Sequence, residues 1–468
     1  MEDFVFVQWR DSAFFKKTFY RTKFFMKDER LILYIRGEWV MKSTLVSKDF
    51  MLVVIGQIIS LFGNAALRFA LPLYLLNLTG SSAVYGTVTA CAFIPAILLS
   101  PIGGIVADRV NKRNIMVLLD FATALLLVLF LGIVDVWNPV VLIALTLMIL
   151  YGIAGAYQPS VQASIPALVH EDEVMVANAI INTISFFSSL VGPVVGGILY
   201  SVYGLKLILW MCMACFVISA IMEVFINIPF ERQDSRMGLW KTVREDLLTS
   251  FHFIKKDKPI IGKVLVMTCG INLFLASMVM VALPYLITEV LDLGTLPVNS
   301  LYGFAEGALA AGGLVGGICA GIFAKKLPVQ TAGTMLVCCV CCVFPLSVFL
   351  LVCSLGPVNY FVLTGCCFFI MMFSTICTVQ MMSFVQKETP SHLVGKVVAL
   401  IMTLSMCAQP LGMALYGILF EACQGIEFIV CLMAGAISLV IALKTCTIFH
   451  RFEEDLGAFI QGEQRENF

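Results

Sequence analysis

Charged residues are scarce in this sequence. Only 13% of its 468 residues are Asp, Glu, Lys or Arg, while 60% are hydrophobic and the mean hydropathy is +0.97. A soluble domain carries about 25% charged residues, and its interior is too small to hide so much apolar surface. The composition therefore excludes an ordinary soluble protein and predicts that lipid surrounds much of the chain.

Histidine is rare as well, which argues against metal or enzyme chemistry. The four histidines are scattered over loops and chain ends. The sequence contains no HExxH motif, no phosphate-binding glycine loop and no zinc-type spacing. We therefore expect no enzyme activity, no bound metal or cofactor and no nucleic-acid partner.

Cysteine is abundant but is not arranged as an extracellular disulfide framework. Of the 17 cysteines, fourteen lie from Cys269 onward, nearly all inside apolar runs that include CCVCC at 338–342. We interpret them as small, polarisable residues that pack between helices. A metal or redox site is the alternative, but no His or carboxylate lies near the cluster.

Long apolar runs make up most of the chain after Phe50. A helix needs about 20 mainly apolar residues to cross a bilayer. Twelve runs of this kind lie at 50–77, 83–107, 114–135, 138–162, 174–203, 205–228, 260–288, 299–324, 329–354, 357–384, 392–421 and 425–448. We expect an all-α, multi-pass membrane protein with twelve transmembrane helices.

The basic residues predict the orientation of these helices. An even number of spans places both termini on the same side. Of the 30 Lys and Arg residues, 28 lie in the tails or in segments on that side, while Lys206 faces the other side and Arg68 lies inside a span. Because cytoplasmic segments are rich in Lys and Arg, both termini are predicted to be cytoplasmic.

A polar stretch at 229–259 divides the runs into two groups of six. Within it, residues 238–256 place apolar side chains at helical spacing and charges mainly on the other face. This pattern predicts an amphipathic helix on the inner membrane surface. The expected organisation is a tail at 1–48, a bundle at 49–228, this linker, a second bundle at 260–448 and a tail at 449–468.

The two groups of runs resemble each other in sequence. FALPLYL at 69–75 returns as VALPYL at 281–286, and GGIVADRVNKRN at 103–114 returns as GGICAGIFAKKL at 316–327. The offsets are 212 and 213 positions, and GPVVGGILY (192–200) has a looser echo in QPLGMALYGILF (409–420). Internal repeats are typical of transporters whose substrate site lies at the midplane between them. We therefore expect two six-helix, pseudo-symmetric bundles.

The first forty residues raise a question about the start of translation. Gly37 and Glu38 can be encoded by a purine-rich stretch that lies two codons before Met41. We hypothesise that this stretch is a ribosome-binding site and that the native bacterial protein starts at Met41. The alternative is a real basic tail, and the DNA sequence distinguishes the two.

Three motifs point to one family. The turn at 103–113 resembles the signature loop between spans two and three of the major facilitator superfamily, and GPVVGG at 192–197 is similar to the second half of its antiporter motif. Residues 151–180 resemble the branch that contains macrolide-efflux proteins and the enterobactin exporter. The resemblance covers roughly residues 48 to 448. It implies a monomeric secondary transporter that works by alternating access on a small-molecule substrate in the bacterial cytoplasmic membrane.

The resemblance assigns an inner gate to a loop formed by Gly103, Gly104, Asp108, Arg109, Lys112 and Arg113. The two glycines would let neighbouring helices approach closely. Asp108 would face a helix N-terminus and an arginine of the other bundle, and would so hold the cytoplasmic side shut. The alternative is a basic loop that only sets topology. The second copy has Gly321 in place of the aspartate, so any such latch is asymmetric.

The antiporter-type motif on the fifth span consists of Gly192, Pro193, Gly196 and Gly197. The proline frees a backbone carbonyl, and the glycines admit close packing. The resemblance connects this motif with export rather than import. An ordinary kinked, tightly packed helix is the alternative.

Polar residues inside the spans are candidates for a substrate cavity: Gln57, Asn64, Arg68, Tyr157, Gln158, Gln162 and Asn272. Arg68 shares a helical face with Gln57 and Asn64, and an arginine within a span usually faces a cavity or a partner. Its counterpart in the second repeat is Met280, so the fold does not require a cation there. Snorkelling toward the outer interface is the alternative. Span four lacks the arginine that many proton-coupled drug antiporters of the superfamily carry.

Four acidic residues within or beside the spans are candidates for coupling. Asp120 and Glu306 lie deepest and are the expected coupling residues. Glu223 and Glu289 lie near span ends and are expected to be solvated.

Together these features predict a secondary transporter that exports an amphipathic small molecule, of drug, macrolide or siderophore type, against a proton gradient. An importer or a sodium-coupled carrier of the same fold is the alternative within transport. A membrane sensor that has lost transport is the alternative from another class.

Overall fold

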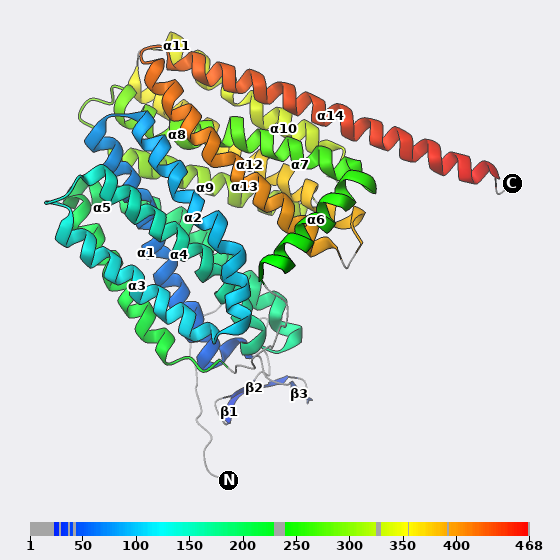
Figure 1. Cartoon of the computed structure of the whole chain (residues 1–468), viewed down its shortest axis with the longest axis horizontal. Coiled ribbons are helices and arrows are strands. Elements are labelled where there is room, and N and C mark those ends of the chain that lie inside the picture. Colours follow the sequence, from blue (N-terminus) through cyan, green and yellow to red (C-terminus); the bar gives the residue numbers. More distant parts are fainter. Residues whose placement is uncertain are drawn as a thin grey trace.

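The computed structural model describes the backbone of residues 23–27, 30–35, 38–40, 44–228, 239–323, 329–353, 355–390 and 393–466. Side chains are described within 44–450, apart from residues 46, 101–109, 171, 239–247 and the breaks between those ranges. Most of the described chain consists of long helices arranged in two groups (Figure 1).

The N-terminal group consists of five helices: α1 (Lys48–Thr79), α2 (Ser82–Arg109), α3 (Lys112–Ile133), α4 (Pro139–Leu168) and α5 (Val174–Val224). Polar caps start several of them. Ser47 accepts a hydrogen bond from the Phe50 amide at the start of α1, and Asn138 caps α4 just before Pro139. These caps satisfy amides that lack a partner within the helix.

Helix α5 consists of two helical segments that meet at Gly204. Its 51 residues would extend about 77 Å if straight, which is more than twice the thickness of a bilayer core. At Gly204 the backbone has φ 72° and ψ −174°, a conformation that breaks the helix and that glycine adopts at little cost. The chain therefore turns back at Gly204, between the predicted runs 174–203 and 205–228.

The C-terminal group consists of eight helices and two π-helical turns: α7 (Pro259–Ile271), η4 (Asn272–Ala276), α8 (Ser277–Tyr285), η5 (Leu286–Val290), α9 (Val298–Ile322), α10 (Thr331–Cys341), α11 (Val343–Val352), α12 (Gly356–Glu388), α13 (Val394–Ala422) and α14 (Glu427–Glu466). The segments from α7 to η5 form one span, and α10 with α11 forms another, broken at Cys342. Helix α14 extends past the rest of the group (Figure 1).

Among the described residues, eleven helical stretches are long and apolar enough to cross a membrane, and α5 counts as one of them. Apolar side chains also cover the outside of the helices. On α3, Leu118, Leu125 and Leu129 are exposed while Leu127 and Phe130 are buried. A helix that is apolar all round requires an apolar environment on its outer face as well. This is the pattern of a multi-pass membrane protein.

Two elements lie outside the two groups. Helix α6 (Leu239–Lys256) matches the helix predicted at 238–256 and packs against α7 and α13. Its predicted apolar face is divided, since Ile254 is buried and Phe251 is exposed. Three short antiparallel strands precede the helices: β1 (Lys23–Lys27), β2 (Arg30–Ile35) and β3 (Glu38–Val40). The expectation of an all-α chain did not include these strands.

All 17 cysteines are free. Several of them face other helices of the C-terminal group. The buried Cys339 Sγ, for example, donates to the Ile370 carbonyl on α12 (3.2 Å). This packing agrees with the interpretation of the cysteine-rich run as helix-packing residues.

Candidate functional site

Two pairs of glycines bring the N-terminal and C-terminal groups into backbone contact at one end of the molecule. On α2 and α13, a Cβ added to Gly86 would lie 2.5 Å from the Met413 carbonyl oxygen and 2.9 Å from the Gly417 Cα. The Ser82 hydroxyl donates to the Gly417 carbonyl (2.9 Å). Only a residue without a side chain permits this approach.

The second crossing, between α5 and α9, repeats the first. A Cβ on Gly303 would lie 2.5 Å from the Pro193 carbonyl oxygen and 3.2 Å from the Gly197 Cα. The Ser300 hydroxyl donates to the Gly197 carbonyl (3.3 Å). Gly197 is 220 positions before Gly417, and Pro193 is 220 positions before Met413. The two crossings are therefore related by the internal repeat, and we call this end of the molecule the closed end.

One acidic residue makes the closed end asymmetric. Glu421 on α13 accepts hydrogen bonds at Oε2 from the Ser81 hydroxyl (2.8 Å), the Ser82 hydroxyl (3.4 Å) and the Ala83 amide (3.3 Å). The carboxylate thus lies on the N-terminus of α2, where the helix dipole favours negative charge. The equivalent position in the N-terminal group is Ser201, which accepts a neutral bond from Ser300 (2.8 Å).

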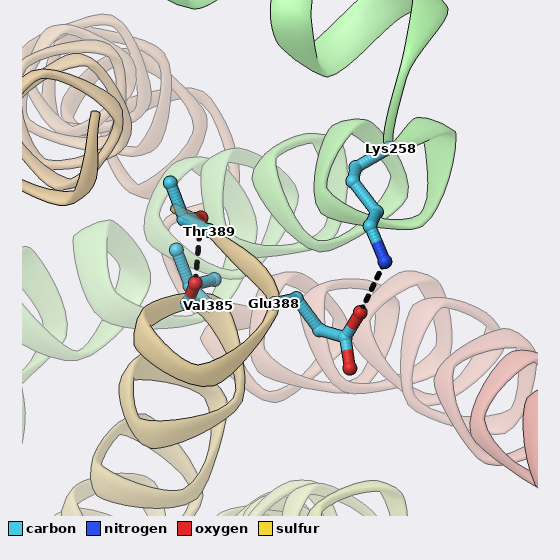
Figure 2. A network of polar contacts seen from close by, with 4 residues as sticks. All are labelled: Lys258, Val385, Glu388 and Thr389. Atoms are coloured by element: carbon cyan, nitrogen blue, oxygen red, sulfur yellow. Dashed lines mark hydrogen bonds and ion pairs between the residues drawn. The ribbon is translucent and has the colours of Figure 1, made fainter. Parts of the chain in front are cut away.

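A second repeated contact lies where the chain enters each group. In the C-terminal group, Lys258 before α7 donates to Glu388 at the end of α12 (2.6 Å), as Figure 2 shows. In the N-terminal group, the Thr44 amide before α1 donates to Glu173 before α5 (2.8 Å). Thr44 lies 214 positions before Lys258, and Glu173 lies 215 positions before Glu388. Each of them ties the first span of its group to the connection between the fourth and fifth spans.

Three cavities share lining residues from one to the next, and the central one lies between the two groups. The central cavity, of about 340 Å³, is lined by α1, α2, α4 and α5 on one side and by α8, α9 and α13 on the other. A second cavity of about 410 Å³ lies mostly in the N-terminal group and shares Asn64 and Arg68 with the first. A third of about 260 Å³ lies in the C-terminal group and shares Met406 with the second.

The cavity walls differ in chemistry between the two groups. The second cavity carries the polar and charged side chains Asn64, Arg68, Asp120, Gln158 and Gln162. The third cavity is lined largely by apolar and thioether groups, among them Met267, Met381, Met382, Met402 and Met406. Methionine side chains are flexible and polarisable, so such a wall adapts to apolar groups of different shape.

Arg68 points into these cavities and rests on an aromatic ring. Its guanidinium carbon lies 3.9 Å from the centre of the Tyr151 ring, and Phe93 packs on the same ring at 5.0 Å. Its Nε is buried and has no hydrogen-bond partner. A cation over an aromatic face is stabilised by about 0.5–2 kcal/mol. The snorkelling alternative does not describe this structure, because Arg68 lines the central and second cavities.

Glu306 also lines the central cavity. Its Oε1 accepts a hydrogen bond from the Tyr302 hydroxyl (3.0 Å), and Phe69 stacks on the Tyr302 ring (4.8 Å). No ion pair forms between Glu306 and Arg68 in the described structure.

Two further carboxyl groups are buried inside the N-terminal group, each with its own hydrogen-bonded neighbours. Asp120 on α3 is 2% exposed and accepts from the Ser60 hydroxyl (3.0 Å). Glu223 on α5 is fully buried and accepts from the Tyr157 hydroxyl (2.7 Å), which in turn accepts from Gln57 Nε2 (2.7 Å). We call these five residues the carboxyl cluster.

The structure corrects two expectations about this cluster. Glu223 was expected to be solvated because it lies near a span end, but it is buried beneath Tyr157. Its carboxylate is bonded to the Tyr157 hydroxyl of α4, so the neighbouring helix accounts for this burial. Gln57 was expected in the cavity, but it is fully buried and belongs to the cluster. Glu289 is exposed, as expected.

The other candidates for the cavity do line a cavity. Asn64, Tyr157, Gln158 and Gln162 line the second cavity, and Asn272 lines the third. On α5, Gly192 packs against Ala65 and Gly196 against Phe69, both on α1, while Pro193 lines the central cavity.

The predicted inner-gate loop lies mainly outside the described side chains. This applies to Gly103, Gly104, Asp108 and Arg109. Lys112 and Arg113 begin α3, where Asn111 accepts from the Arg113 amide as the cap (3.1 Å). The role of this loop stays a prediction.

Sequence reasoning missed Glu421, Tyr151 and Tyr302. The internal repeat could have pointed to Glu421, because the equivalent position in the first repeat, 220 residues earlier, is the uncharged Ser201. The two tyrosines gave no such signal, since aromatic residues are common in membrane helices.

Comparisons with known proteins agree with this architecture. Residues 53–413 match the family model described as Major Facilitator Superfamily. Macrolide efflux protein A of Streptococcus pyogenes is 26% identical over 371 residues, which cover 77% of this chain and 86% of that protein. Multidrug efflux pump Tap of Mycolicibacterium fortuitum is 23% identical over 373 residues, with the same coverage. The crystal structure of the nucleoside transporter NupG has the same fold, with a TM-score of 0.67 and 14% identity over 85% of this chain and 98% of that chain.

Proposed function

The chain belongs to the major facilitator superfamily, and from that premise we propose that it exports amphipathic small molecules by alternating access, driven by protons. The family assigns the chain to transport across a bacterial membrane rather than to the catalysis of a covalent reaction. The observation that supports this proposal best is the central cavity, which both groups of helices line. The glycine crossings close the molecule at one end of this cavity.

We propose twelve spans in two pseudo-symmetric bundles, at residues 49–228 and 260–448. The break of α5 at Gly204 supports this count, because it divides one of the eleven helical stretches into two. The repeated glycine crossings and the repeated contacts before α1 and α7 support the symmetry. We further propose that both termini are cytoplasmic, which the distribution of Lys and Arg supports.

With this orientation, the closed end faces outward. The turns at Gly80 and Gly204 lie on the outer side, and the glycine crossings lie within a few turns of them. The structure is then the inward-facing state of the cycle, in which the cavities are loaded from the cytoplasm. Opening toward the outside requires that α2 separates from α13 and α5 from α9.

The chemistry of the cavities favours an amphipathic substrate. Polar groups and the Arg68 guanidinium on the N-terminal side would bind polar or anionic parts of a substrate. The methionine-rich wall on the C-terminal side would accept an apolar body. Efflux is also the activity named for the two related proteins, the macrolide efflux protein and Tap.

An accumulation assay in an efflux-deficient bacterium tests this function. Cells that express the chain are compared with vector controls for uptake of labelled macrolides, lipophilic cations and catecholate siderophores. We expect lower accumulation of at least one class, and we expect a protonophore to abolish the difference. Equal accumulation of every compound, with folded protein in the membrane, would favour a sensor that does not transport.

A further inference from the structure

We propose that Asp120 and Glu223 together form one proton-binding site, and that this site couples the transport cycle to the proton gradient. The proposal rests on the proposed export function and specifies which groups carry the proton. It pairs Asp120 with Glu223, whereas the sequence led us to expect Asp120 and Glu306 as the coupling residues.

The first argument is the burial of two acids without a counter-charge. Asp120 Oδ2 and Glu223 Oε2 are both buried and have no hydrogen-bond partner. No described Lys, Arg or His lies within ion-pair distance of either carboxyl group. A buried, unpaired carboxylate is costly, and a second one close by adds repulsion. At least one of the two groups therefore holds a proton in this state.

The charged and titratable groups that face the cluster can be named for each helix. Helix α4 contributes Tyr157, α1 contributes only the neutral Gln57 and Ser60, and α5 contributes Ser219 beside Glu223. Two arginines occupy more distant positions on the same helices. Arg113 precedes Asp120 on α3 by seven residues, about 10 Å along the axis, and Arg68 follows Ser60 on α1 by eight, about 12 Å.

The second argument is that the cluster connects the cavity with the interior of the bundle. Asp120, Ser60 and Tyr157 line the second cavity, whereas Glu223 lies behind Tyr157. The Tyr157 hydroxyl donates to Glu223, and Tyr157 lines the same cavity as Asp120. Asp120 is thus the member that exchanges protons with water in the cavity. Glu223 shares with it the negative charge that remains when only one of the two groups is protonated.

Each transport cycle releases one proton from Asp120 to the inside and binds one proton from the outside. In the inward-facing state, the O–H bond of the Asp120 carboxyl group breaks and the proton passes to water in the cytoplasmic cavity. The carboxylate that remains then accepts a hydrogen bond from a donor group of the substrate. After the cavity opens to the outside, the substrate leaves and a proton from outside water binds the carboxylate again. One proton enters as one substrate leaves.

The test uses the full-length protein in proteoliposomes with a radiolabelled macrolide as the probe. Gradient-driven transport and energy-independent exchange are measured for the wild type, Asp120→Asn, Glu223→Gln and the double variant. Asp135→Asn is the matched control, because Asp135 is an exposed acid just beyond the far end of the same helix α3. We expect the cluster variants to lose at least tenfold in gradient-driven transport and to retain exchange, while the control keeps both.

A second measurement does not depend on any substrate. Infrared difference spectra recorded between acid and neutral pH report the carbonyl stretch of protonated carboxyl groups. We expect the wild type and Asp135→Asn to show such a band, and either cluster variant to lose or shift it. Gradient-driven transport at the wild-type rate in the double variant, or an unchanged band in both single variants, overturns the proton site. Failure of the wild type to transport, with the band present and sensitive to both variants, contradicts export of the probe but retains the site.

Discussion

Glu421 at the closed end offers a direct test of how that end is held shut. The substitution Glu421→Gln keeps the size of the side chain and one acceptor oxygen, but it removes the negative charge from the N-terminus of α2. A charge at a helix N-terminus contributes about 0.3–1 kcal/mol. Bonds to a charged group exceed neutral ones by about 1 kcal/mol. The closed end should therefore lose about 1–2 kcal/mol relative to the open one, which is roughly a 5- to 30-fold shift in the equilibrium.

The assay measures the distance between the two groups of helices at the closed end. Leu78 and Leu296 are exposed positions on either side of it and are suited to carry two probes. The probes are attached through noncanonical amino acids, because the 17 native cysteines would react with thiol labels. Pulsed electron resonance should show a larger population with separated groups in Glu421→Gln than in the wild type. Glu289→Gln, an exposed acid near the same end, is the control. Identical distance distributions for both variants and the wild type would refute the latch.

Three further predictions concern packing and charge. Gly417→Val places a side chain where a Cβ alone would lie 2.7 Å from a carbonyl oxygen. Transport by this variant should fall about tenfold or more at normal abundance in the membrane. The control Gly317→Ala has open space around it and should transport normally. Arg68→Met should insert and fold normally and should raise the half-saturating concentration for anionic substrates more than for neutral ones, as measured by initial rates; equal effects on both would contradict the assigned role. Lys258→Met should lower the unfolding midpoint in detergent by about 2 °C or less, because the pair with Glu388 is partly exposed; a much larger drop would show a stronger tie than the geometry indicates.

The helices and their order could be predicted from the sequence because membrane solvation imposes a simple rule. Each span needs a long apolar run, and the runs read from the sequence agree with the helices to within a few residues at most ends. The break at Gly204 was visible as the boundary between two runs. The three strands before α1 were not predicted, because no alternating pattern marks them.

The candidate site was only partly predictable. Asn64 and Arg68 could be placed on one face of a helix by their spacing, and both line the cavities. Gln57 shares that spacing but lies where α1 meets α4, so the neighbouring helix decides its environment. Glu223 was judged from its distance to a span end, yet it is buried against Tyr157 on another helix. Periodicity defines the face of a single helix, but burial depends on packing between helices.

Oriented flux measurements with purified protein test the central proposal most directly. The chain is reconstituted into proteoliposomes, an acid-inside pH gradient is imposed, and the uptake of a labelled macrolide is followed with and without a protonophore. Gly417→Val serves as the form that cannot complete the closed end. The account predicts accumulation above the external concentration, abolished by the protonophore and by the variant. Uptake that stops when the internal and external concentrations are equal would contradict proton-driven alternating access. So would wild-type uptake that is no greater than uptake by the variant or uptake without a pH gradient.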